Sequence, residues 1–174
     1  MKDISNEVIK ETKEQPAVGI SNSMLANSVV NKYTLWSAGA GLIPVPALDM
    51  AAVAGFQVKM LSDLSDVYKV QFSENAARAI IAALTGSLSA GYLAQRYGAS
   101  FIKSIPFLGF LSALAMPIYS GAITWAIGKV FVKHFESGGT FLTFDVEKMK
   151  VYFSDMYKQG KAAVKSLRAE PAKA

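Results

Sequence analysis

Several stretches of the chain contain no charged residue, and three of them are separated by segments in which charge gathers. These three stretches cover residues 33–48, 79–95 and 104–128, which makes them 16, 17 and 25 residues long. A bilayer core about 30 Å thick needs roughly 20 apolar residues of α-helix, because each residue adds about 1.5 Å. Only the third stretch is therefore long enough to cross a membrane without help.

Two prolines divide the first uncharged stretch. Pro44 and Pro46 remove backbone donors and disfavour the α conformation just before them, so a helix is expected to end near Gly41. The next helix is expected to start close to Pro46 and Asp49, since proline fits a first turn and a carboxylate is favourable at a helix N-terminus. Apolar residues then recur every three or four positions as far as Tyr68, which predicts one buried face.

Two glycine- and alanine-rich helices are expected next. Ser73 as N-cap and Gly98 as stop signal predict the first, over about 74–97. Pro106 opens the second, which should end at the glycines of residues 138–139. The small residues expected to permit close helix packing or assembly are Gly86, Ala90, Gly121, Thr124 and Gly128.

Matched lengths and small-residue faces predict that segments 79–95 and 107–131 pack as an antiparallel helical hairpin. We expect residues 105–131 to be embedded in or inserted into a membrane, with both hairpin ends on the cytoplasmic side. Shallow insertion from one face is the alternative to full spanning, because Arg96 and Lys103 would lie near the hairpin tip.

The last helix is predicted to be amphipathic and basic. A short extended segment, residues 140–144, leads to Asp145 as its N-cap. Its apolar residues are Val146, Met149, Val151, Phe153, Met156 and Tyr157. Its proposed membrane-surface residues are Lys148, Lys150, Lys158, Lys161 and Lys165. Anionic lipid is favoured over nucleic acid as their partner, because the aromatic residues lie on or beside the apolar side and no nucleic-acid fold signature is present.

These elements predict an all-α fold, a compact bundle of about five or six helices. Residues 1–27 are expected to form an N-terminal amphipathic or flexible segment, 28–155 the helical domain, and 156–174 the basic helix end and tail. A homo-oligomer or a stable hetero-complex is expected. The small-residue faces, together with Trp36 and Trp125, give more apolar surface than a single copy of the chain readily buries.

Composition narrows the class of protein. The 174 residues are 52% hydrophobic with mean hydropathy +0.28, which excludes a disordered chain and fits a single domain. Eighteen basic and 13 acidic residues give a charge of +5, which favours an anionic partner. The absence of cysteine suits a reducing compartment. The N-terminus lacks the apolar region of a secretory signal, so the mature chain is expected to begin here.

No catalytic constellation is present, so the chain is not expected to be an enzyme or to hold a cofactor or metal. His134, the single histidine, lacks further ligands and is interpreted as a helix-end residue near solvent. Asp49 is interpreted as a helix cap in preference to an ion-pathway carboxylate. There is no phosphate-binding loop and no dinucleotide fingerprint, so Gly138 and Gly139 are interpreted as turn residues.

Four segments carry a family resemblance: GLIPVPALDMAAVAGFQVKML, SIPFLGF, AITWAIGKVFVKHFESGGTF and FDVEKMKVYF. Over residues 28–155 the chain resembles the bacterial YcjF-related domain of unknown function, which in many proteins follows a GTPase domain. The most specific parts are the Ile-Pro-x-Pro-x-x-Asp turn, followed by Gln57 and Met60, and residues 128–139. The resemblance implies a helical, membrane-associated module that works with a GTPase, which here must be encoded separately, and no established catalytic activity.

Three hypotheses about function follow. The first is a self-assembling membrane-associated scaffold or adaptor, located at the cytoplasmic side of a bacterial inner membrane. The second is a soluble, all-helical protein-interaction module whose apolar stretches are core. The third is an enzyme or pore in which Asp49 acts chemically, which the lack of paired titratable groups disfavours.

Overall fold

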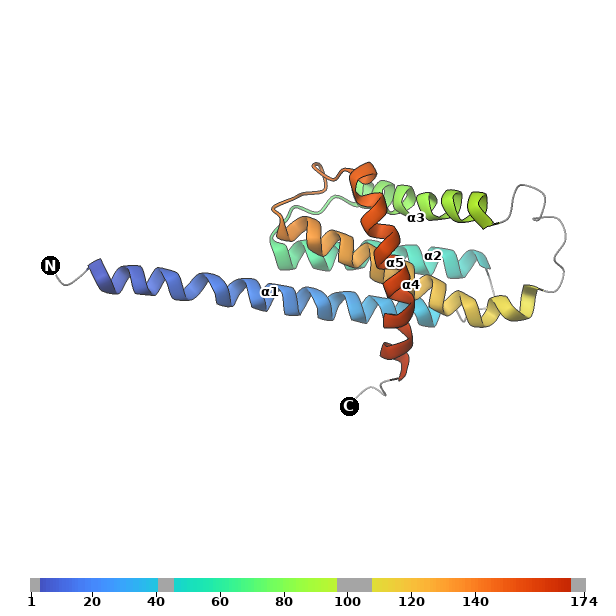
Figure 1. Ribbon diagram of the computed structural model, residues 1–174, viewed down its shortest axis with the longest axis horizontal. Coiled ribbons are helices and arrows are strands. Elements are labelled where there is room, and N and C mark those ends of the chain that lie inside the picture. Colours follow the sequence, from blue (N-terminus) through green and yellow to red (C-terminus); the bar gives the residue numbers. More distant parts are fainter. Residues whose placement is uncertain (1–3, 41–45, 97–107, 170–174) are drawn as a thin grey trace.

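The computed structural model describes the fold of residues 4–40, 46–96 and 108–169, and the side chains of 22–40, 51–88 and 117–169. Within these residues the chain forms five α-helices and no strand. The helices are α1 (Ile4–Ala40), α2 (Pro46–Tyr68), α3 (Glu74–Arg96), α4 (Leu108–Glu136) and α5 (Val146–Ala169). The predicted all-α bundle is confirmed (Figure 1).

The helix ends follow from the local sequence. α1 ends at Ala40 and α2 begins at Pro46, where the proline pattern predicts a break. Gly138 ends α4 in a left-handed conformation (φ 79°), and its N–H donates to the Phe135 carbonyl at 2.9 Å. The Asp145 carboxylate caps α5 by accepting a hydrogen bond from the Lys148 N–H at 3.2 Å. Pro44 and Pro106 lie outside the described residues.

The link between α4 and α5 is a turn, whereas the sequence predicted an extended segment over 140–144. The Thr143 N–H donates to the Thr140 carbonyl at 3.2 Å, and the Thr140 N–H donates to the Thr143 hydroxyl at 2.9 Å. This turn directs Phe141 into the core and leaves Leu142 91% exposed. Side-chain hydrogen bonds of threonine to nearby backbone therefore outweigh the extended preference of the segment.

α1 is continuous through the boundary that the sequence placed between residues 27 and 28. Ala26 and Val30 are both fully buried, so the bundle already includes the residues before that boundary. At the other end, Tyr157 and Val164 are buried beyond the boundary predicted at residue 155. The helical unit is thus longer in both directions than the predicted 28–155.

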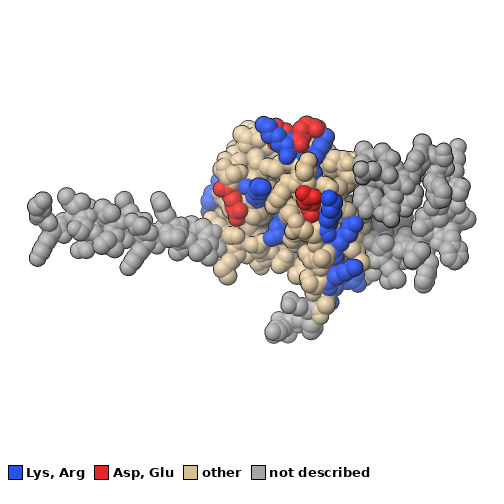
Figure 2. All heavy atoms as spheres, in the orientation of Figure 1, with Lys and Arg blue, Asp and Glu red and all other residues tan. Residues whose placement is uncertain are grey.

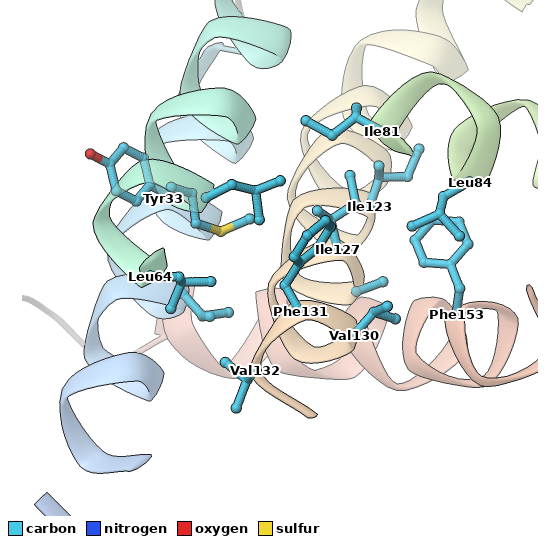
Figure 3. Packing of buried hydrophobic residues seen from close by; sticks show 14 of the residues in the cluster. Tyr33, Leu64, Ile81, Leu84, Ile123, Ile127, Val130, Phe131, Val132 and Phe153 are labelled. Atoms are coloured by element: carbon cyan, nitrogen blue, oxygen red, sulfur yellow. The ribbon is translucent and has the colours of Figure 1, made fainter. Parts of the chain in front are cut away.

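α4 forms the centre of the bundle. Its Ile123, Ile127 and Val130 lie between α2 on one side and α3 with α5 on the other, as Figure 3 shows. α1 runs alongside α4, and α5 folds back across it (Figure 1). Such burial on all sides explains why the α4 sequence is nearly free of charge.

The predicted hairpin of 79–95 with 107–131 is wrong for the described residues. α4 packs chiefly against α1 and α5, whereas α3 packs mainly against α5 and α2 and touches α4 only slightly. A small-residue face shows that another helix can approach closely, but it does not specify which helix does so.

The long apolar stretch at 105–131 is largely a core helix where its side chains are described. From Pro117 to Phe131 most residues are buried, and Tyr119 alone is exposed. Among the described residues, no helix has the length and hydropathy that a membrane span requires. The prediction that this stretch is embedded in a membrane is therefore not supported by residues 117–131, and residues 105–116 lie outside the described side chains.

Candidate membrane-binding surface

α5 presents its basic residues outward because its apolar side is anchored on α4. Phe153, Tyr157, Gly160 and Val164 are buried. A Cβ atom at Gly160 would lie 2.8 Å from the Ala122 carbonyl oxygen, so glycine allows the two helix backbones to approach closely. Val151, predicted on the apolar side, is instead 73% exposed. Figure 2 shows lysine and arginine side chains following α5 down the face of the molecule.

The basic residues in the N-terminal half of α5 are paired with acids one turn earlier. Lys148 binds Asp145 at 3.1 Å and Lys158 binds Asp155 at 3.1 Å. Lys150 forms the same kind of pair with Glu147. These exposed pairs contribute little stability, but they neutralise much of the charge in this half of the helix.

The C-terminal half of α5 keeps its positive charge. Residues 159–169 contain Lys161, Lys165 and Arg168 and no acid. Lys161 lies over the ring of Tyr157, 4.8 Å from its centroid. In the described part of the chain, no acidic side chain forms an ion pair with Lys165 or Arg168. The predicted set of five lysines therefore divides into a largely neutralised half and a cationic half.

Two lysines of α4 also lie over aromatic rings. The Lys129 ammonium is 5.2 Å from the centroid of Trp125, and the Lys133 ammonium is 4.1 Å from that of Tyr152. Lys129 also donates a hydrogen bond to the Asn27 carboxamide oxygen. Burial lowers the pKa of Lys129 from its ordinary value. Such lysine and aromatic pairs combine an apolar body with a polar end, as residues at membrane interfaces do.

The predicted packing residues fall into different environments. A Cβ at Gly121 would lie 2.8 Å from Val164 Cγ2, and one at Gly128 would lie 2.6 Å from Val30 Cγ2, so both glycines permit close helix contacts. Thr124 is buried. Gly86 is exposed, and a Cβ placed there would have no described atom within 4 Å. The side chain of Ala90 lies outside the described residues. Gly160 occupies the close contact that the sequence did not identify.

A buried polar chain joins three helices. The Gln57 side-chain amide of α2 donates to the Thr124 hydroxyl of α4 at 3.1 Å, and that hydroxyl donates to Ser37 of α1 at 2.9 Å. All three side chains are buried. The sequence singled out Gln57 and Thr124 separately, but nothing in their spacing revealed that they meet.

A charged cluster fixes α1 to α2. The Asp63 carboxylate accepts hydrogen bonds from Lys59 at 2.7 Å, Tyr33 at 2.9 Å and Lys32 at 3.1 Å. Burial alone would raise the pKa of Asp63, but these three hydrogen bonds together lower it below its ordinary value. Burial, with the hydrogen bond to Asp63, raises the pKa of Tyr33. No sequence pattern indicated this cluster, because its members come from two helices.

His134 is buried, in contrast to the predicted position near solvent. Its Nε2 lies 2.8 Å from the Thr140 carbonyl oxygen, and its ring packs edge-on against Phe144. Gly139 lies so close that a Cβ there would be 2.3 Å from the imidazole. The turn after α4 folds back over the helix and covers the ring. Asp49 is the fourth residue of α2, and its side chain lies outside the described residues, so its role as a cap stays a prediction.

Together these features define an all-α helical bundle with a basic helix on its surface. The chain belongs to the family described as a domain of unknown function, DUF697, whose model matches residues 11–162. It is 33% identical over 151 residues to magnetosome membrane protein 22 of Magnetospirillum gryphiswaldense. That match covers 86% of this chain and 77% of the relative. No solved structure matches the chain.

Proposed function

We propose that the protein is a membrane-associated helical scaffold that attaches to anionic lipid through α5. The observation that carries the proposal is the cationic half of α5, where Lys165 and Arg168 are both exposed. The name of the magnetosome relative, a membrane protein, supports the same location for this chain. Because the described helices include no membrane span, attachment from one side of the bilayer is the form that we propose.

The number of basic residues in the cationic half of α5 sets the expected free energy of membrane attachment. A basic residue near an anionic bilayer contributes about 1 kcal/mol, so Lys161, Lys165 and Arg168 together contribute about 3 kcal/mol. This attraction decays over a Debye length of about 8 Å at physiological ionic strength. The attachment should therefore be reversible and should weaken as salt is added.

Vesicle flotation tests the attachment. We expect the protein to float with phosphatidylcholine vesicles that contain phosphatidylglycerol, and to remain unbound with phosphatidylcholine alone. Replacing Lys165 and Arg168 with glutamine should lower the vesicle partition coefficient by roughly 30-fold, from a loss of about 2 kcal/mol. The matched control, Lys148→Gln with Lys150→Gln, removes the same formal charge from the paired half and should have a smaller effect. Equal binding to neutral and anionic vesicles, or none to either, would overturn the proposal.

Self-assembly and a separate GTPase partner complete the proposed scaffold, at the cytoplasmic side of a bacterial inner membrane. The GTPase is supported by the resemblance to the YcjF-related domain. Light scattering in buffer without detergent tests self-assembly, and a monodisperse monomer there would contradict it. Affinity purification of the protein from membranes tests the GTPase partner, with GDP added to one sample and a nonhydrolysable GTP analogue to the other. Recovery of no GTPase with either nucleotide would contradict the proposed partner.

A protein-interaction module without membrane insertion is the second candidate function. It is favoured by the burial of residues 117–131, since the most apolar part of the described chain serves as core. The flotation experiment distinguishes the two functions, because a module of this kind remains with the unbound protein at every lipid composition.

A further inference from the structure

One face of α1 is exposed and largely apolar. Met24 is 68% exposed, Leu25 54%, Leu35 39% and Trp36 50%. At 100° per residue these four side chains, with Ser28, Lys32 and Gly39, occupy about a third of the helix circumference. The opposite side of the helix carries buried residues such as Ala26 and Val30. We call the exposed third, over residues 24–39, the outer face of α1.

The outer face carries little net charge. Lys32 is its single charged residue. The Lys32 ammonium is 3.1 Å from the Asp63 carboxylate and 5.5 Å from the centroid of the Trp36 ring. Its charge is thus partly compensated by Asp63 of α2, which Lys59 shares, and it lies beside an aromatic ring. Four of the seven exposed large hydrophobic side chains in the described residues gather here. Such a gathering on one helix marks an interaction surface.

The cationic half of α5 borders this segment of α1. Val164 of α5 and Ala38 of α1 both adjoin Gly121, where a Cβ would lie 2.8 Å from Val164 Cγ2 and 3.1 Å from Ala38 Cβ. In Figure 1, the C-terminal end of α5 passes α1 and extends beyond it. Lys165 directly follows Val164 in the chain, and Arg168 lies one turn further on. The end of α5 that carries these two cations therefore lies next to the C-terminal part of α1, the helix that carries the outer face.

We infer that the outer face of α1 enters the headgroup region of an anionic bilayer while Lys165 and Arg168 bind lipid phosphates. This inference rests on the proposed attachment of α5 to lipid and adds the element that inserts. The positive charge of α5 favours lipid over a second copy of the chain as the partner of the outer face. Two copies joined through this face would bring two cationic α5 ends together, whereas an anionic bilayer attracts the same charges.

The residue types suit an interfacial position. A helix that lies in the membrane plane buries its apolar side by about 5–10 Å and keeps its basic residues at the lipid phosphates. Trp36 supplies an aromatic ring of the kind enriched at the membrane surface. Lys32 can place its aliphatic stem against Trp36 and its ammonium in water.

Tryptophan fluorescence tests the inference, because the chain has only Trp36 and Trp125. In the Trp125→Phe variant, Trp36 is the single tryptophan. Adding vesicles of phosphatidylcholine and phosphatidylglycerol should shift its emission to shorter wavelength, and brominated lipid should quench it. The Trp36→Phe variant reports Trp125, which is partly buried against Gly160 and should change much less. Subtracting the Trp36→Phe spectrum from that of the unmodified protein gives the Trp36 signal if Trp125→Phe does not fold.

Binding measurements with matched variants complete the test. Leu25→Asn with Leu35→Asn should weaken vesicle binding at least tenfold. The control pair, Leu142→Asn with Val151→Asn, removes two apolar side chains that are at least as exposed and lie outside α1, and it should leave binding within twofold.

Vesicle binding with no change in Trp36 emission would overturn the inference and leave the proposed attachment intact. A Trp36 blue shift that follows protein concentration without lipid would also overturn it, since a second copy would then cover the face. Absence of vesicle binding would overturn the attachment and the inference together.

Discussion

Two glycines illustrate how the environment of a single residue decides the effect of adding a methyl group. Gly160 and Gly86 both lie inside helices. At Gly160 a Cβ would meet the Ala122 backbone, which cannot move aside as a side-chain end would. At Gly86 the same atom would meet none of the described atoms within 4 Å. The sequence pattern pointed to close packing at Gly86 and not at Gly160.

We predict opposite effects of alanine at these positions. Gly160→Ala should lower the free energy of unfolding by about 1–3 kcal/mol, because overpacking forces α5 away from α4. Gly86→Ala should raise it by up to about 1 kcal/mol, since alanine favours the helix and meets no obstacle. Urea unfolding followed by circular dichroism measures both. Destabilisation of similar size in the two variants would contradict the close contact at Gly160.

The free energy of unfolding should depend on pH through the carboxylate of Asp63. Its pKa is lowered in the folded state, so the stabilisation is present above the unfolded pKa of about 3.9 and is lost as the pH falls through the folded value. Asp63→Asn should therefore be less stable than the unmodified protein from pH 5 to 7, the difference should begin to shrink below about pH 4, and it should vanish once the pH falls below the folded pKa of Asp63. Urea unfolding across this pH range measures the difference. A constant difference down to the most acid pH would show that the ionised carboxylate is not responsible.

At the scale of elements, the sequence predicted where helices begin and end better than how they pair. Pro46, Asp145 and Gly138 act locally, since each changes the hydrogen bonds or backbone angles of its own turn. The pairing of α4 with α1 and α5 depends on surfaces that are far apart in the chain. Small-residue periodicity is the same whichever helix lies opposite, so it does not reveal the partner.

Only part of the proposed membrane-binding surface could be predicted from the sequence. The five lysines of α5 were identified from helical spacing, and the amphipathic character of the helix is confirmed by its buried residues. The sequence placed Trp36 among the apolar residues that exceed what one unit buries, but it did not identify the outer face of α1, because Leu35 resembles a core residue in an uncharged stretch. Whether an apolar residue lies in a core or on a surface depends on which other helices cover it.

The polar chain through the core provides a prediction about three helices. Thr124→Val removes the hydroxyl that joins Gln57 to Ser37 and leaves two buried polar groups without their partner. We expect a loss of about 1–3 kcal/mol in the free energy of unfolding. Thr124→Ser keeps the hydroxyl and should lose about 0.8 kcal/mol, the value of one buried methyl group. If serine and valine destabilise equally, the hydrogen bonds do not contribute.

At the scale of the whole molecule, α5 has two roles that depend on opposite sides of the helix. Its inner side completes the core through Phe153, Tyr157 and Val164, while its outer side carries the cations. Membrane attachment through the outer side therefore requires no opening of the bundle. The same arrangement places the cationic half next to α1, so that lipid contact by either helix brings the other close to the surface.

The inner side of α5 leads to a prediction about truncation after residue 155. Burial of a tyrosine or valine side chain contributes about 1.5–3 kcal/mol, so losing Tyr157 and Val164 costs about 3–6 kcal/mol. A domain of this size has a total stability of about 5–15 kcal/mol, and the truncation also exposes the α4 surface around Gly121 and Ala122. We expect the 1–155 fragment to lose its cooperative thermal transition in circular dichroism and to bind a hydrophobic dye. The full-length Lys165→Gln, Arg168→Gln variant should keep that transition, because both residues lie on the outer side. A 1–155 fragment that unfolds cooperatively near the full-length Tm would show that the end of α5 is dispensable for folding and serves the surface alone.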